Sequence, residues 1–453
     1  MQTWSIKPAE PVQGRIPLCG LDFVGGYRYF DGVRFFDERL DVDRLREALA
    51  RTVTRYPILG GTLQQEDGRV FIDLDGPGLT FALESSAVAC PSFGPGIPQI
   101  SQPQLFLPKP TAPRRPGGPL EPVFGKPMLL LKLTRFSDGR FALGGSTCHM
   151  LSDAITIGTW FEDCYRYYSG REPGPAPVFS RDTLLQHGDM TAECPSARSG
   201  LELRERTVDE IKSLFFIARF ASVNISPEES AVIDWIVGES GGTLFNRNDL
   251  LHALLMKSFA AVVPESEPNV AIDLVYDVRR IKSFGIPATY CGNAVLHRWF
   301  TLPRTEVLET PIESIAARIR AFGKSDPESA RQDIGFLQRE YLMNGLTDAG
   351  VLPRVQAPLG PGSLIVNNHS ASPNTRVTFG GLALWTDLAI NEPMPIRMAM
   401  LYPDLHGGMA LMLVLAHEQV DRYVEAWRRC LNELTSARAT IPPAMPAARV
   451  AVS

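Results

Sequence analysis

The chain has 453 residues, of which 44% are hydrophobic and 21% are charged, and its 45 basic and 50 acidic residues give a formal net charge of −5. This composition is typical of globular proteins. It argues against an intrinsically disordered chain, which has fewer apolar residues, and against a nucleic-acid-binding protein, which usually has a basic excess. Because one hydrophobic core rarely serves more than about 250–300 residues, we expect two domains, over 1–200 and 201–453.

Three features that the sequence lacks indicate the cellular compartment. The first residues, MQTWSIKPAEPVQGRIPL, show no basic stretch followed by an apolar one, so no signal peptide is recognised. The apolar run Met409–Ala416 is far shorter than the roughly 20 residues that span a bilayer. Seven scattered cysteines without a C-x-x-C pair suit buried thiols in a reducing compartment. We therefore expect a cytoplasmic protein with no membrane or nucleic-acid partner and no metal.

The first part of the chain predicts mixed helices and strands. A helix over 41–56 has Asp41 as its cap and Leu45, Leu49 and Val53 on one face. A hairpin over 60–74, turning at 66–68, follows it. Residues 91–127 contain 11 prolines, which excludes regular structure and predicts a long surface excursion.

Two strands and a helix come next. The strands are expected over 127–136 and 140–150, and the helix over 152–170 with its cap at Ser152 or Asp153. A proline-rich linker then extends to about Ala197. For the second half we expect helices and strands in this order: a helix over 204–220, a strand over 231–238, a helix from about 248, a strand ending at 277–280, a strand within 286–300, a long helix over 311–343 and a C-terminal helix over 418–437.

One of the seven histidines has a setting that suits catalysis. His149 ends an apolar strand directly before a helix, and Asp153 follows four residues later. A neutral imidazole at such a cleft edge accepts a proton from a hydroxyl or an amine near pH 7. So short an H-x-x-x-D pattern is, on its own, more often a packed histidine and an ordinary helix cap.

Matches elsewhere in the sequence favour a catalytic His149 over a packed one. The segment over 127–154 resembles the strand pair and H-x-x-x-D motif of the BAHD acyl-CoA-dependent acyltransferases. Further matches follow in the family's order: Leu21-Asp22, Tyr56–Gly61, Asn246–Lys257, Asp277-Val278-Arg279 and Tyr290–Ala294. The resemblance therefore covers most of the chain.

The resemblance implies a fold and an activity. The fold would be α/β with mixed sheets, in the two-domain chloramphenicol-acetyltransferase-like arrangement. His149, in a channel between the domains, would be the general base that lets a hydroxyl or amine of a specialised metabolite attack an acyl-CoA thioester. Asp153 would point away from substrate and pair with Arg279, which supports the site. Acyl-CoA would be a co-substrate, no cofactor would be tightly bound, and the enzyme would be a monomer.

The family's late D-F-G-W-G motif is degraded here. Our preferred register places Thr378–Leu382 on it, and a competing register places Asp387–Pro393 there. Because the family's oxyanion and cofactor contacts are associated with this region, no residue is assigned to those contacts.

Three other functions remain open. Gly238–Gly242 fits the G-x-S-x-G elbow of α/β-hydrolases, although no helix is expected directly after Ser240. Condensation domains of peptide synthetases share the architecture but usually carry H-H-x-x-x-D-G, where this chain has Cys148 and Ala154. A non-catalytic binding protein on the same scaffold would explain the degraded motif. The pair Arg114-Arg115 is expected to be a solvated loop rather than a phosphate site.

Overall fold

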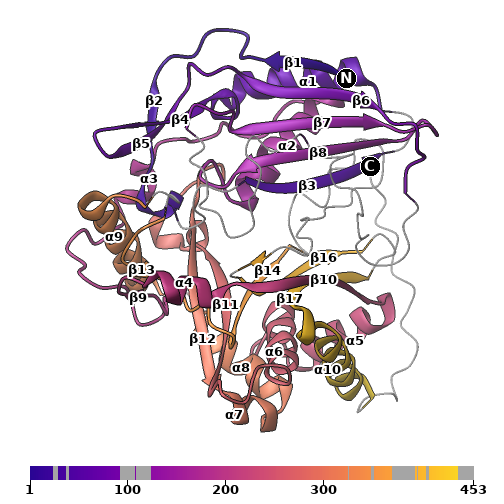
Figure 1. Cartoon of the computed structure of the whole chain (residues 1–453), viewed down its shortest axis with the longest axis vertical. Helices are drawn as coiled ribbons and strands as arrows, with labels where there is room; N and C mark the ends of the chain where they lie inside the picture. Colours follow the sequence, from indigo (N-terminus) through magenta and orange to yellow (C-terminus); the bar gives the residue numbers. More distant parts are fainter. Residues whose placement is uncertain are drawn as a thin grey trace.

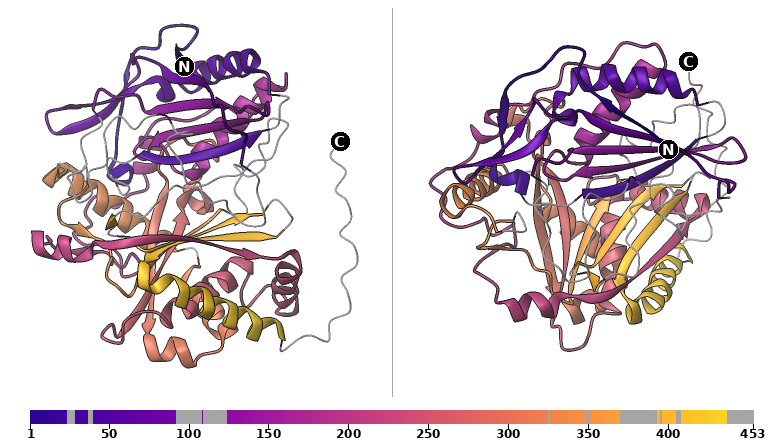
Figure 2. Two further views of the ribbon diagram at one scale, coloured as in Figure 1. Left: turned by 45° about the vertical axis from the view of Figure 1, so that its right-hand side comes forward. Right: turned by 45° about the horizontal axis from the view of Figure 1, so that its top comes forward.

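A computed structural model describes residues 1–23, 29–36, 40–91, 108, 124–324, 326–347, 351–369, 393–394, 396–404 and 408–436. Two sheet-rich domains face each other (Figures 1 and 2). Both sheets mix parallel and antiparallel strands, which confirms the predicted mixed α/β class.

The first domain is built on a five-stranded sheet. Its strands in spatial order are β1 (Gln2–Ile6), β6 (Leu79–Ser85), β7 (Leu129–Arg135), β8 (Phe141–Cys148) and β3 (Tyr29–Phe36). Helices α1 (Val42–Arg55) and α2 (Ala154–Tyr168) bury apolar side chains against it, so Leu49 and Trp160 share one core with Leu131. Burial of this apolar surface is the main contribution to the stability of the layer pair.

A small sheet and two short helices extend this domain. Strand β2 (Arg15–Pro17) pairs with β5 (Arg69–Asp73), which forms the predicted hairpin with β4 (Thr62–Glu66). Asp67 and Gly68, at the hairpin turn, both have positive φ angles, 49° and 74°. The 3-10 helices are η1 (Gly20–Phe23) and η2 (Pro57–Gly60).

The second domain contains a seven-stranded sheet. Its spatial order is β12 (Val295–Pro303), β11 (Asn269–Asp277), β14 (Ser363–Asn368), β16 (Met398–Pro403), β17 (Met409–Ala416), β10 (Phe216–Ile225) and β15 (Pro393–Met394). One face packs against α5 (Pro227–Glu239), α6 (Arg247–Ala260), α8 (Ile312–Phe322) and α10 (His417–Ser436). The opposite face is turned toward the first domain (Figure 1).

The remaining elements lie outside the two large sheets. They are α3 (Asp182–Leu185), β9 (Glu202–Leu203), α4 (Val208–Leu214), η4 (Val278–Arg280), η5 (Lys282–Phe284), α7 (Arg304–Glu309), α9 (Pro327–Asn344) and β13 (Val355–Gln356), which pairs with β9. Side chains of α9 and of residues 278–296 belong to the core of the first domain. We keep the division near residue 200 as a proposal, with these segments returning to the first domain.

Three predicted elements are wrong. Residues 231–238 form part of helix α5, because Ser226 and Glu229 make a capping box that starts a helix there. The helix expected over 204–220 ends at Leu214, and β10 follows because it pairs with β17 along its length. The helix expected over 311–343 is two helices, since Asp326 caps a new one with Pro327 in its first turn.

Candidate active site around His149

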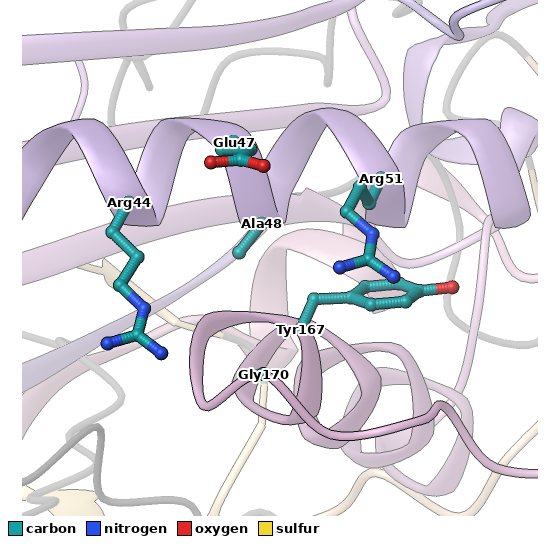
Figure 3. A pocket seen from close by; sticks show the side chains of 6 residues that line it. All are labelled: Arg44, Glu47, Ala48, Arg51, Tyr167 and Gly170. Carbon is teal, nitrogen blue, oxygen red and sulfur yellow. The ribbon is translucent and has the colours of Figure 1, made fainter.

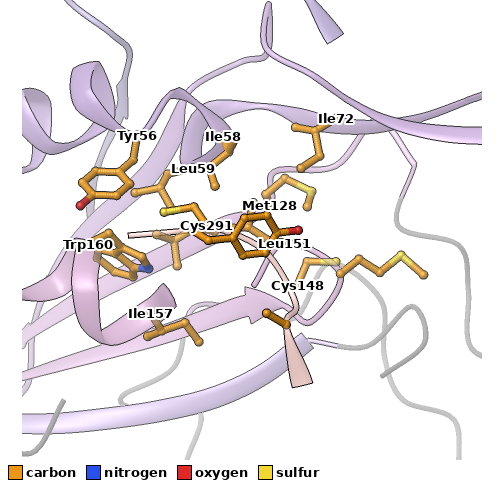
Figure 4. Packing of buried hydrophobic residues seen from close by; sticks show 14 of the residues in the cluster. Tyr56, Ile58, Leu59, Ile72, Met128, Cys148, Leu151, Ile157, Trp160 and Cys291 are labelled. Atoms are coloured by element: carbon orange, nitrogen blue, oxygen red, sulfur yellow. The ribbon is translucent and has the colours of Figure 1, made fainter. Parts of the chain in front are cut away.

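His149 lies in the turn that joins β8 to α2, and its neighbours fix that turn. Cys148, Met150 and Leu151 are fully buried, and the Leu151 amide donates to the Cys148 carbonyl at 3.0 Å. Figure 4 shows Cys148 and Leu151 among the packed side chains of the first domain's core. His149 itself is half-buried, so the ring is held at the edge of the core rather than sealed inside it.

Asp153 is the N-cap of α2, as the sequence predicted for Ser152 or Asp153. Its Oδ1 accepts the Thr156 amide at 2.9 Å. Its Oδ2 pairs with Arg279 Nη2 at 2.9 Å and also accepts the Ala294 amide at 3.0 Å. The ion pair expected from the family resemblance is therefore present, and it joins the H-x-x-x-D turn to the second half of the chain.

Both terminal nitrogens of Arg279 have acceptors, whereas its buried Nε has none among the described residues. It pairs with Asp277 at 3.0 Å, and its Nη2 donates to the carbonyls of Tyr290 and Gly292 at 3.2 and 3.0 Å. Burial lowers the pKa of Arg279, but the charges of Asp153 and Asp277 outweigh burial and raise that pKa overall. The guanidinium thus remains a permanent cation that holds the loop over 290–294 against the start of α2.

A second chain of contacts holds the main chain of His149. Asn293 Nδ2 donates to the His149 carbonyl at 2.9 Å and contacts Asp22 Oδ1 at 3.4 Å. Asp22 forms a fully buried ion pair with Arg181, 2.9 Å from Oδ2 to Nε. Burial lowers the pKa of Arg181, but the Asp22 charge, together with smaller contributions from Tyr290, Cys19 and the hydrogen bond to Asp22, raises it overall. These contacts connect η1, the segment before α3 and the start of β12 at one point.

Sequence reasoning missed the roles of three of these residues. Asp22 and Asn293 were recognised only as motif letters, without a partner. Arg181 lies in a segment that looked like a linker, and no local pattern marks an arginine whose carboxylate partner is 159 residues away. The long-range pairing is visible only in the folded chain.

The thiols next to the site are not candidate nucleophiles. Burial raises the pKa of both Cys148 and Cys291 to about 12, so neither forms a thiolate near neutral pH. Six of the seven cysteines are buried and all seven are free, in agreement with the sequence prediction.

The structure around Ser240 does not support the α/β-hydrolase alternative. Ser240 is the C-cap of helix α5, and its Oγ donates to the Val237 carbonyl at 2.7 Å. A nucleophile elbow needs a strand before the serine and a helix after it. Gly238–Gly242 is instead a helix end followed by a turn.

Several other predictions fall outside the described residues. These are the surface excursion within 92–107 and 109–123, which includes Arg114-Arg115, and both registers of the degraded motif, 378–382 and 387–393, except for Pro393. Within the described part of the chain, no cluster of histidine, cysteine, aspartate and glutamate could hold a metal ion. No helix there is long and apolar enough to cross a bilayer.

A pocket of about 200 Å³ lies between α1 and α2, lined by Arg44, Glu47, Ala48, Arg51, Tyr167 and Gly170 (Figure 3). The guanidinium of Arg51 lies 4.1 Å from the centre of the Tyr167 ring. This pocket is at the C-terminal end of α2, roughly 20 Å from the His149 turn at a rise of about 1.5 Å per residue. It is therefore separate from the candidate active site.

Comparisons with known proteins identify the family of the chain. A family model described as the Transferase family matches residues 1–425. The acyltransferase GLAUCE of Arabidopsis thaliana is 24% identical over 64% of this chain and 66% of its own length. Rosmarinate synthase of Plectranthus scutellarioides is 29% identical over 40% of this chain and 41% of its own. The alignments with these and similar relatives span 29% to 66% of the relatives' length.

Solved structures share the fold over nearly the whole chain. Vinorine synthase gives a TM-score of 0.65 at 15% identity and covers 93% of this chain and 95% of its own. TRI101 of F. graminearum, solved with coenzyme A and T-2 mycotoxin, gives 0.62 at 17% identity and covers 90% and 96%. The condensation domain of the polyketide synthase MokA gives 0.62 at 12% identity and covers 94% and 98%. With the family model matching most of its length, the chain belongs to the Transferase family of BAHD acyltransferases.

Proposed function

We propose that the protein transfers an acyl group from a coenzyme A thioester to a hydroxyl or amine of a small molecule, with His149 as general base. The observation that carries this proposal is the half-buried His149 at the end of β8, with Asn293 and Arg279 of the second half binding both ends of its turn. The named activities of the relatives support the reaction class.

The proposed reaction needs one base and two proton movements. The imidazole of His149 accepts the proton of the acceptor hydroxyl or amine as that oxygen or nitrogen attacks the thioester carbonyl. The tetrahedral intermediate then collapses, the C–S bond breaks, and the departing sulfur of coenzyme A takes the proton from the imidazolium. Asp153 and Arg279 are positioning residues, because both carboxylate oxygens of Asp153 already accept hydrogen bonds from the helix start, Arg279 and Ala294.

Release of free coenzyme A with p-coumaroyl-CoA or acetyl-CoA and a panel of alcohols and amines tests the proposal. General-base catalysis typically contributes about 10²–10⁴-fold, so we expect His149→Ala to lower kcat by about that factor. His417→Ala is the matched control, since His417 is exposed at the start of α10. Wild-type turnover in His149→Ala on an accepted substrate would refute the base assignment.

A carrier-protein-dependent condensation activity is the second candidate, because solved condensation and epimerisation domains share this fold. In this chain a buried cysteine, Cys148, precedes the active-site histidine. We expect acyl-CoA to be used faster than the same acyl group on a carrier protein at equal concentration. The reverse order would favour condensation, and stabilisation by coenzyme A without turnover would favour a binding protein.

We further propose that the enzyme is a cytoplasmic monomer. Six buried thiols and no disulfide among seven cysteines support a reducing compartment. Size-exclusion chromatography with light scattering would give about 50 kDa for the monomer of 49.9 kDa.

A further inference from the structure

We infer that the pocket between α1 and α2 binds a short aliphatic dicarboxylate, at a site separate from the candidate active site. The pocket of about 200 Å³ is lined by Arg44, Glu47, Ala48 and Arg51 of α1 and by Tyr167 and Gly170 at the end of α2. Its three charged residues are exposed, so a ligand reaches them directly from solvent. The inference does not depend on the proposed acyltransferase activity.

The two arginines of the pocket differ from the other arginines of these helices. The others are each paired with a carboxylate: Arg46 with Asp43, Arg55 with Asp163 and Arg166 with Glu162. Arg44 and Arg51 form no ion pair with any residue that the structure describes. The pocket therefore holds two positive charges that the described chain does not neutralise.

Glu47 stands one helical turn from both arginines and pairs with neither. A glutamate four residues before a basic residue is the favourable order for an ion pair on a helix. The Cζ atom of Arg51 instead lies 4.1 Å from the centre of the Tyr167 ring, and that of Arg44 lies 5.2 Å from the centre of the Tyr168 ring. These cation–π contacts fix both guanidinium groups against α2.

The ring contacts indicate what each arginine offers to a ligand. A guanidinium placed over a ring interacts through its face, and its five N–H groups point outward in its plane. Within the described ranges, neither the Arg44 nor the Arg51 side chain donates a hydrogen bond. Donors in this planar arrangement match the oxygens of a carboxylate or a phosphate, often through two parallel hydrogen bonds. The ligand is therefore an oxyanion.

The middle of the pocket selects among oxyanions. Figure 3 shows the two guanidinium groups at opposite ends of the pocket, with Ala48 between them. The α-carbons of Arg44 and Arg51 are about 10.5 Å apart, at about 1.5 Å per residue over seven residues. Ala48 presents a methyl group, and Gly170, whose φ angle is 71°, presents no side chain. A ligand with a carboxylate at each end and a short hydrocarbon chain between them matches this arrangement.

Size and charge exclude other anions. The volume is below the roughly 300–1,000 Å³ of pockets for drug-sized ligands, so coenzyme A does not fit. The Glu47 carboxylate also lines the pocket and repels an anion, so a ligand needs both arginines to bind. Inorganic phosphate is a single compact ion and would engage one arginine at a time.

Isothermal titration calorimetry of the whole chain with malonate, succinate, glutarate and adipate tests the inference. We expect saturable binding in the millimolar range or tighter, strongest for one chain length. Arg44→Ala and Arg51→Ala should each weaken that binding about tenfold or more, since each removes a charge-assisted contact. Arg46→Ala is the matched control, because it removes the same charge from the same helix but lies over Trp4. Its Kd should stay within about twofold of the wild type.

Glu47→Gln should act in the opposite direction. Removal of the like charge should tighten binding of the preferred dicarboxylate about two- to fivefold. Far-UV circular dichroism of each variant checks that α1 and α2 remain folded. A gain in affinity from one exchange and a loss from its neighbours on the same helix face would not follow from a general change in stability.

The outcomes separate the site from the proposed function. Absence of saturable binding, or an equal loss in Arg46→Ala and Arg51→Ala, would overturn the site, because the attraction would then be absent or spread over the surface. Tighter binding of inorganic phosphate or pyrophosphate than of every dicarboxylate would overturn the ligand class. If the wild type acylates no acceptor but the variants change dicarboxylate binding as expected, the proposed function fails and the site stands.

Discussion

Removal of the Asp153 carboxylate should destabilise the fold far more than removal of an ordinary helix cap. Asp153→Ala loses the cap contact to Thr156, the ion pair with Arg279 and the Ala294 contact. A lost cap costs about 1 kcal/mol. Breaking a buried ion pair by removing one partner costs about 3–5 kcal/mol. Arg279 keeps Asp277 as a partner, so we take the ion-pair cost at the lower end of its range, about 3 kcal/mol. With about 1 kcal/mol for the cap, the expected total is about 4 kcal/mol.

Asp41 provides a matched control for this substitution. It caps α1 by accepting the Arg44 amide at 3.0 Å, but it lies on the surface. Asp41→Ala should therefore cost only about 1 kcal/mol. Asp153→Asn should fall between the two, because asparagine caps a helix as well as aspartate does but carries no charge for Arg279.

Urea unfolding, followed by tryptophan fluorescence and far-UV circular dichroism, measures the free energy of unfolding of the wild type and the three variants. The two probes must report one transition for the free energies to be meaningful, since two domains can unfold separately. If Asp153→Ala is within 1 kcal/mol of Asp41→Ala, the ion pair with Arg279 makes no net contribution, and our account of how the turn is held is wrong.

Two further predictions concern stability. A β-carbon at Gly335 in α9 would overlap the Asp189 carbonyl, whereas one at Gly238 in α5 would meet open space. Measured by thermal unfolding, Gly335→Ala should cost about 3 kcal/mol. Gly238→Ala should gain about 0.5–1 kcal/mol. A gain at both positions would contradict the packing of α9. Burial lowers the pKa of His369 from 6.5 to about 4, so the unfolded chain binds the proton first, and stability should be full above pH 6.5 and fall toward pH 4. His369→Gln should reduce the loss of unfolding free energy over that interval by about 1–2 kcal/mol. An unchanged dependence of that free energy on pH would exclude His369 as its source.

Local signals predicted the first domain well. The helix capped by Asp41 and the hairpin around Asp67 are encoded within a few residues each, by a cap, a repeat and a turn. The strand pair before His149 is equally local, because its turn and alternation lie within one stretch of sequence. The family resemblance then supplied the arrangement of the domains, which no local pattern contains.

The second domain shows where local signals fail. Residues 231–238 are a short apolar run, which periodicity alone does not distinguish as a buried strand or a buried helix. The deciding signal was the capping box at Ser226, which lies before that run and was not recognised. The single helix predicted over 311–343 took no account of Pro327, which stands in the first turn of a second helix.

The residues of the candidate site also differ in whether local sequence patterns predict them. Asp153 was predictable from local sequence, because it follows His149 by four residues and stands where the helix cap is expected. Arg279 was predictable only through the family motif. Arg181 was predictable neither from a local pattern nor from the motif, because its carboxylate partner Asp22 is 159 residues away. Asp153 holds two parts of the chain together. Its Oδ1 accepts a hydrogen bond from the first turn of α2, and its Oδ2 binds the guanidinium of Arg279 from a distant segment. Because both of its oxygens are bound, Asp153 fixes the backbone of the turn that contains His149. Asp153 and Arg279 therefore position the turn, and His149 alone is the proposed base.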